Sequence, residues 1–230
     1  MSLFADRGYD RARLLSQAAR ARARGRRRKA IALYRRVLEV EPHNDVLHKR
    51  VAQMLAQARR IDEALGHYRK AADGLINRGF EDHAIAVYRE SLHFHPKVTW
   101  VWSTVAKLEA QRGRVPDAVE TLRDGARCFR SGRARGDALS LLGQAHRLDP
   151  GSAAAGLDLS RVLLKLGHRR RALGVLDEVV PHVRGRDLRR IRGRQFNLSP
   201  TPAALCRYVG SCFSRGRRDP IARPADAAAG

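Results

Sequence analysis

Apolar and polar residues alternate along residues 1–184 with the spacing of amphipathic helices. Ala30 and Tyr34 are four residues apart, so they lie on one helix face. Ala84 and Tyr88 repeat this pair of a small and a large residue. Glycines and prolines between the apolar stretches mark turns. These signals predict ten helices, at about residues 8–24, 26–40, 45–58, 62–77, 80–94, 99–112, 116–131, 134–148, 153–166 and 170–184.

The apolar pattern also repeats at an interval of 54 residues, through small, large and helix-ending positions. These positions are Ala30, Ala84 and Ala138; Ala64, Ala118 and Ala172; Tyr34, Tyr88 and Leu142; and Pro42, Pro96 and Pro150. Such a period is typical of repeat proteins, in which each unit buries its apolar face only by stacking on its neighbours. The expected fold is therefore an all-α helical-repeat solenoid with an extended functional surface.

The residues at these positions carry a family resemblance. The stretch Gly25-x4-Ala30-x3-Tyr34-x7-Pro42 resembles the second half of a tetratricopeptide repeat, with its glycine, small residue, aromatic residue and terminal proline. Residues 79–96 carry the same pattern. The resemblance implies a right-handed solenoid of about ten antiparallel helices that binds a protein or peptide.

The resemblance spans about residues 8–184, which we expect to form the solenoid, after a flexible stretch at residues 1–7. The chain departs from the family because its repeat holds three helices in 54 residues, whereas family repeats are helix pairs of about 34 residues. This departure leaves open which helix faces line the concave groove.

By the resemblance, polar positions on the first helix of each repeat face the groove. The expected groove residues are Lys49, Gln53, Gln57, Trp100, Ser103, Lys107, Gln111, Arg161 and Lys165. An ordinary solvated helix face would show the same polarity. Trp100 is the candidate anchor for a partner, because large aromatic residues often dominate interfaces; it could instead cover the neighbouring helix. Trp102 points to another side of the helix and is expected in the core.

The net charge of +23 is concentrated toward the two ends of the chain. Residues 11–38 hold eleven basic residues and no acidic residue. The densest part is a basic patch of Arg20, Arg22, Arg24, Arg26, Arg27, Arg28 and Lys29. It would attract an acidic protein or nucleic-acid phosphates, although a solvated solenoid end or an arginine-rich coding bias would also explain it. No aromatic residue interleaves the charges, which disfavours base stacking on this stretch.

Residues 185–230 lack the 54-residue spacing and are expected to form a basic, largely disordered tail. A short helix is predicted at 202–214, with Thr201 as its N-cap and Pro202 at its first position. Its apolar stripe is Leu205, Tyr208, Val209, Cys212 and Phe213. A helix of this length is marginal alone, so we expect it to cap the solenoid, dock on a partner or lie on an anionic membrane surface.

The chain carries no phosphate-binding loop, zinc-protease motif or nucleophile elbow. Its histidines scatter and its three cysteines form no paired motif, so we expect no catalytic residue, no metal and no cofactor. No signal peptide or membrane span is recognisable, which favours the cytoplasm. The sequence therefore predicts a non-enzymatic adaptor for a peptide or acidic protein in a bacterial multiprotein or regulatory assembly. The alternative is a nucleic-acid-associated regulator that uses the arginine-rich ends; the partner and the oligomeric state stay open.

Overall fold

The computed structural model describes residues 9–213, and the regular secondary structure of this part is entirely helical. The chain divides into two compact units, Met1–Pro96 and Lys97–Gly230. The flexible segment predicted at residues 1–7 lies outside the described residues, as does the tail beyond 213. The all-α helical-repeat prediction is confirmed.

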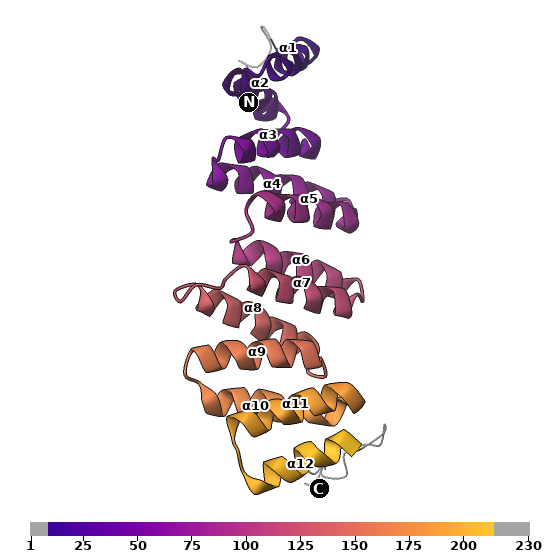
Figure 1. Cartoon of the computed structure of the whole chain (residues 1–230). Coiled ribbons are helices and arrows are strands. Elements are labelled where there is room, and N and C mark those ends of the chain that lie inside the picture. The colour runs from indigo at the N-terminus through magenta and orange to yellow at the C-terminus, as the bar shows by residue number, and fades with distance from the viewer. Residues whose placement is uncertain (1–8, 214–230) are drawn as a thin grey trace, which may run out of the picture. The chain divides into compact units, whose positions relative to one another are not determined.

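The described residues of the first unit, 9–96, form five helices, each packed on the next (Figure 1). They are α1 (Arg11–Ala23), α2 (Arg27–Val40), α3 (Asp45–Gln57), α4 (Ile61–Asn77) and α5 (Glu81–Phe94). α3 also contacts α5, so these two helices lie on the same side of α4. Tyr34, Tyr68 and Tyr88 are buried between the helices together with the repeat alanines Ala30 and Ala84.

The second unit, described from residue 97 to 213, is also a series of packed helices (Figure 1). Its helices are α6 (Thr99–Gln111), α7 (Val115–Arg127), α8 (Arg135–Leu148), α9 (Ala153–Lys165), α10 (Arg169–Val179), the 3-10 turn η1 (Val180–His182), α11 (Gly185–Leu198) and α12 (Pro202–Phe213). Besides α7, α6 contacts α8, and α7 also contacts α9. α6 and α8 therefore form one layer of the stack, and α7 and α9 form the other.

The turns follow the predicted chemistry. Gly25, Gly79, Gly113 and Gly167 all adopt a positive φ of 70° to 83° at the turn after a helix. This backbone conformation strains residues that have a Cβ atom. At the opposite end of a repeat, Pro96 follows shortly after α5, because a proline disfavours helical geometry in the residue before it.

Trp102 occupies the core position that the sequence predicts for it. Its ring is partly buried and packs against the core of the second unit. A Cβ atom on Gly125 would lie 2.7 Å from Cγ of Trp102. α7 therefore needs a glycine at this position for the indole ring to fit between α6 and α7.

The prediction of a largely disordered tail from residue 185 is wrong for residues 185–198, which form α11. Leu188, Ile191 and Leu198 are buried in the same core as α9 and α10. The Arg169 side chain donates hydrogen bonds to the Leu198 carbonyl and thereby joins α10 to the end of α11. The boundary predicted at residue 184 thus falls inside the packed helices.

Candidate functional site

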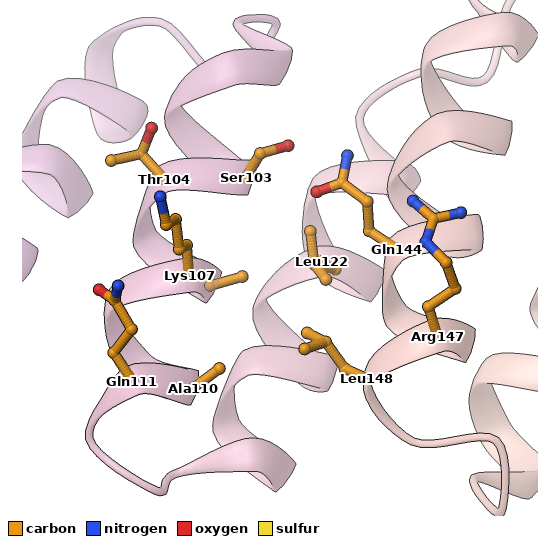
Figure 2. A pocket seen from close by; sticks show the side chains of 10 residues that line it. Ser103, Thr104, Lys107, Ala110, Gln111, Leu122, Gln144, Arg147 and Leu148 are labelled. Atoms are coloured by element: carbon orange, nitrogen blue, oxygen red, sulfur yellow. The ribbon is translucent and has the colours of Figure 1, made fainter.

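A hollow of about 630 Å³ lies between α6 and α8 and is called the α6–α8 hollow below. Figure 2 shows Lys107 and Gln111 on one side of it and Gln144 and Arg147 on the other. The remaining lining residues are Ser103, Thr104, Ala106, Ala110, Leu122 and Leu148. The hollow thus combines an apolar floor with polar side chains at its edges, which suits a peptide segment.

The charge of the α6–α8 hollow is positive, since its lining contains Lys107 and Arg147 but no carboxylate. Both cations are exposed, and within residues 9–213 neither forms an ion pair. The Thr104 hydroxyl donates to the Trp100 carbonyl at 2.8 Å and is therefore engaged within α6. Two cations that face each other across an apolar floor can bind acidic side chains on either side of an apolar residue.

The structure brings three of the predicted groove residues, Ser103, Lys107 and Gln111, to this one hollow. Trp100 lies one turn before Ser103 and Thr104 on α6, and 40% of it is exposed. It does not line the hollow but extends the same helix face toward the beginning of α6. Sequence reasoning missed Gln144 and Arg147, because it assigned the groove only to the first helix of each repeat.

In the first unit, two predicted groove residues are engaged in internal contacts. Lys49 Nζ lies 3.1 Å from a carboxylate oxygen of Glu90. Gln53 donates to Glu90 at 2.7 Å, and the Tyr68 hydroxyl donates to it at 3.2 Å. Burial, assisted by the Glu90 charge, raises the pKa of Tyr68. These contacts join α3, α4 and α5, while Gln57, also predicted for the groove, is exposed.

Arg161 and Lys165 do not join the α6–α8 hollow. They line a separate hollow of about 440 Å³ between α7 and α9, with Phe129 and Leu142 among its apolar residues. The two hollows belong to opposite layers, because α6 packs with α8 and α7 packs with α9. A single groove that contains both sets of residues is not formed in the second unit.

The number of helices in the repeat explains this separation. α6 and α9 occupy equivalent positions 54 residues apart, with two helices between them. Successive helices alternate between two layers, so a step of three helices moves from one layer to the other. Equivalent residues of α6 and α9 therefore lie on different sides of the stack.

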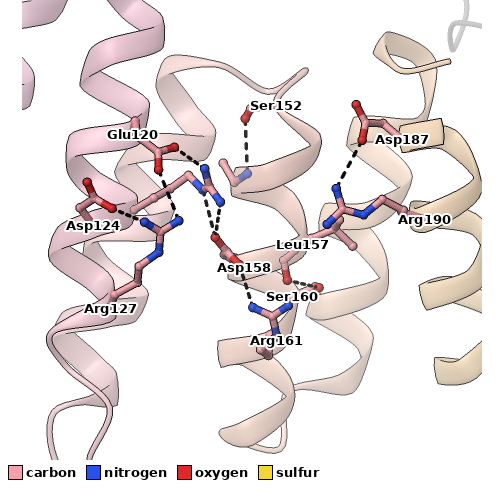
Figure 3. Close-up of polar contacts among 12 residues, drawn as sticks. Glu120, Asp124, Arg127, Ser152, Leu157, Asp158, Ser160, Arg161, Asp187 and Arg190 are labelled. Carbon is pink, nitrogen blue, oxygen red and sulfur yellow. Dashed lines mark hydrogen bonds and ion pairs between the residues drawn. The ribbon is translucent and has the colours of Figure 1, made fainter. Parts of the chain in front are cut away.

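Three of the five arginines that line the α7–α9 hollow are paired with carboxylates (Figure 3). Arg123 binds Asp158 at 2.9 Å and also pairs with Glu120. Arg127 pairs with Asp124 and lies 3.3 Å from Glu120. Arg161 binds Asp158 at 2.8 Å, so this carboxylate receives two guanidinium groups. We call these side chains the paired arginine cluster; it connects α7 to α9.

The basic patch predicted at Arg20–Lys29 lies at the turn between α1 and α2, and all seven of its basic side chains are exposed. α2 begins at Arg27 with no acidic residue in its first turn and no side-chain cap. Positive charges at a helix N-terminus add to the positive end of the helix dipole. The turn therefore concentrates positive potential, and no carboxylate of the described residues forms an ion pair with the patch.

The predicted C-terminal helix is present as α12, and its N-cap is correct: the Thr201 hydroxyl accepts from the Ala204 amide at 3.1 Å. Residue 214, the predicted end, lies outside the described residues. α12 packs on α11, but its predicted stripe is largely turned away. Leu205 and Val209 are each 44% exposed and Phe213 is 81% exposed. Cys212 is also exposed.

Small residues make the α12 contact instead. Ala204 and Ser211 are buried. Tyr208, the one half-buried member of the predicted stripe, lies parallel to Phe196 with ring centroids 6.4 Å apart. Small residues allow α12 to approach α11 closely. The larger side chains of the apolar stripe would keep the two helices further apart. Leu205, Val209 and Phe213 therefore do not cap the solenoid, and their docking on a partner or on an anionic membrane surface stays a prediction.

Two chemical features of the described residues bear on the remaining predictions. No group of three histidine, cysteine or acidic side chains in this part is arranged to hold a metal ion. None of the helices in residues 9–213 has the length and apolar character needed to cross a membrane.

Residues 133–194 match the family model described as tetratricopeptide repeat. No curated protein matches the chain. Among solved structures, the chain is similar to a tetratricopeptide repeat protein from Parabacteroides merdae, at 14% identity and a TM-score of 0.27, covering 87% of this chain and 91% of that one. It is similar to Pseudomonas aeruginosa pilF at 15% identity and a TM-score of 0.29, covering 87% and 88%. A human IFIT1 dimer matches at 18% identity and a TM-score of 0.33, covering 80% of this chain and 54% of that one.

Proposed function

We propose that the chain, whose residues 133–194 match the tetratricopeptide repeat model, is a non-enzymatic scaffold that binds an acidic peptide segment in the α6–α8 hollow. Repeats of this kind generally serve as platforms for protein partners. The finer expectations, a cytoplasmic location and a bacterial assembly, stay predictions.

One observation carries the proposal: Lys107 and Arg147 face each other across an apolar floor, and neither forms an ion pair within the described residues (Figure 2). Leu122 and Ala106 are buried beneath them. A peptide with one apolar side chain between acidic residues would match this arrangement in shape and charge. Trp100 at the beginning of α6 is proposed as an additional anchor.

A displayed library of random twelve-residue peptides tests the proposal, with the full chain as bait. We expect the selected peptides to share an apolar residue flanked by Asp or Glu. A second selection uses the double variant Lys107→Glu and Arg147→Glu, which should lose these peptides. The matched control is Lys97→Glu with Arg133→Glu, which makes the same charge change at exposed positions that line neither hollow.

Selection of the same peptides by wild type and the hollow variant would reject the proposed site. Loss of binding in both double variants would show that overall charge, rather than the hollow, attracts the peptides. Trp100→Ala should weaken binding of a selected peptide by about tenfold, the effect of a moderate hot spot, and leave helicity unchanged in circular dichroism. If this variant unfolds, the indole ring belongs to the core and the anchor assignment is wrong.

A further inference from the structure

α11 presents a row of arginines on the face opposite its buried side. Arg186, Arg190 and Arg194 follow one another at intervals of four residues, which places them along one helix face, and Arg189 lies beside them, three residues after Arg186. Leu188, Ile191, Gln195 and Leu198 occupy the buried face. The low apolar content of this helix concealed it in the sequence, and the same arginines give its outer face a strong positive charge.

This row forms one wall of a hollow of about 450 Å³, called the arginine pocket below. α9 contributes Arg161 and Leu157, and α12 contributes Tyr208. Gly193, in the middle of the arginine row, lets α12 close the pocket on one side. A Cβ atom at this position would lie 3.1 Å from the Tyr208 ring.

Only part of the positive charge in the arginine pocket is balanced. Arg190 lies 3.5 Å from Asp187, and Arg161 binds Asp158 at 2.8 Å (Figure 3). For Arg186, Arg189 and Arg194, no carboxylate in residues 9–213 forms an ion pair. Three of the five guanidinium groups thus keep an uncompensated charge in one pocket.

The chemistry of the lining restricts the ligand. An arginine carries five N–H donors and no acceptor, so the pocket wall consists mostly of donors. A peptide would bring backbone N–H groups that find few acceptors here, whereas a phosphate group offers only acceptor oxygens in the geometry that a guanidinium group binds in a bidentate manner.

We propose that the arginine pocket binds a ligand through two or more phosphate groups. The arginines of α11 lie about one helical turn apart, roughly 5.4 Å, so they form a row of contacts suited to a chain of phosphates. Such a chain is supplied either by the backbone of single-stranded nucleic acid or by inorganic polyphosphate. The proposal does not depend on peptide binding, because the α6–α8 hollow is lined by different helices.

Fluorescence anisotropy of the full chain with a labelled twelve-nucleotide single strand tests this site, with inorganic polyphosphate and polyglutamate as competitors. The test variant replaces Arg186, Arg189 and Arg194 with Gln. The control variant replaces Arg26, Arg27 and Arg28 of the basic patch with Gln, which removes the same charge. Circular dichroism checks that both variants keep their helices.

We expect the pocket variant to bind at least tenfold more weakly and the control variant to stay within threefold of wild type. The slope of log affinity against log salt should fall by about 2 in the pocket variant, since each single-strand phosphate contact contributes about 0.7. Arg189→Lys keeps the charge but loses the planar fork, so it should weaken binding about threefold. Tighter binding of the oligonucleotide or of polyphosphate identifies the source of the phosphates.

Three results would overturn the proposal. Equal losses in the two triple variants would show attraction by net charge alone. Competition by polyglutamate as strong as that by polyphosphate would show that the pocket does not distinguish phosphate from carboxylate. Absence of saturable binding of either phosphate chain would leave the pocket without its proposed ligand.

Discussion

The paired arginine cluster and the arginine pocket lie in the same unit, and both consist mainly of arginines. They differ in whether carboxylates surround these arginines. In the cluster, Arg123 is 15% exposed and binds both Glu120 and Asp158. In the pocket, Arg189 and Arg194 have no ion-pair partner in the part of the chain that the structure describes. The first arrangement connects helices, and the second leaves charge available for a ligand.

This difference shows that arginine content alone does not indicate function. A stretch rich in arginine serves packing where acidic residues recur on the adjoining helix, as Asp158 does opposite α7. Where such residues are missing from the facing surface, its charge stays available for a ligand. Pairing across helices, which the linear sequence does not display, separates the two cases.

Arg123→Ala should have the largest effect on stability. The substitution leaves Asp158 with one guanidinium partner and removes the connection from α7 to α9, which should lower the free energy of unfolding by about 1–3 kcal/mol. Arg189→Ala, at an exposed position, should change it by less than about 0.5 kcal/mol. Urea unfolding followed by circular dichroism measures both. Equal losses would remove the distinction between the two regions.

Two neighbouring histidines of the first unit, His48 and His67, show how burial rather than ion pairing determines whether a side chain is charged. His48 Nε2 lies 3.0 Å from the Pro42 carbonyl, which only accepts, so this nitrogen carries the proton. His48 Nδ1 then accepts from His67 Nδ1 at 2.8 Å. Burial, with the His48 ring and Arg35 nearby, lowers the pKa of His67 from 6.5 to about 4. Protonation of His48 at Nδ1 would set two N–H groups against each other.

The pH dependence follows from this shift. Between pH 6.5 and about 4, His67 takes up a proton in the unfolded chain but not in the folded one. The unfolded state therefore binds more protons, and stability decreases as the pH falls through this window. We expect His67 to account for a loss on the order of 1–2 kcal/mol, discounted for its partial exposure. Urea unfolding at pH 7.5 and 4.5 should show a smaller decrease for His67→Gln than for wild type; an equal decrease would contradict the assignment.

A smaller effect is expected when a carboxylate is added to the arginine pocket. Asn197→Glu places an acid three residues after Arg194 on the same helix face. The spacing is that of Asp158 and Arg161 in the paired arginine cluster, although the order of acid and arginine is reversed. Binding of the labelled single strand should weaken by about threefold to tenfold, with a change in stability below about 0.5 kcal/mol. Asn197→Gln is the control and should bind as wild type does. Unchanged binding of Asn197→Glu would mean that the charge of the pocket is not what holds the ligand.

Local chemistry made most of the helices predictable. Gly25 and Gly79 mark turns because few other residues adopt a positive φ without strain, and both do so here. Repeat alanines such as Ala118 and Ala172 are fully buried, as the 54-residue interval indicates. The core position of Trp102 could be predicted because Trp100, two residues earlier, points to another side of the helix.

The remaining features depend on packing between segments. α11 escaped detection because its buried face consists of a few apolar residues among many arginines. The contact of α12 with α11 could not be predicted from its apolar stripe, since the small residues Ala204 and Ser211 form it. The predicted groove residues of the second unit lie in two separate hollows. This separation was not predictable, because the sequence shows how many helices a repeat contains but not the layer in which each helix lies.

The three-helix repeat has a consequence for how such a protein changes over generations. When a module with an odd number of helices is copied, the copy inherits each surface residue but displays it on the reverse side. Lys107 of α6 and Arg161 of α9, placed 54 residues apart on equivalent helices, already stand in this relation. A binding surface could therefore be lengthened only by adding modules in twos, whereas a single duplication would create a second surface, free to acquire a separate ligand.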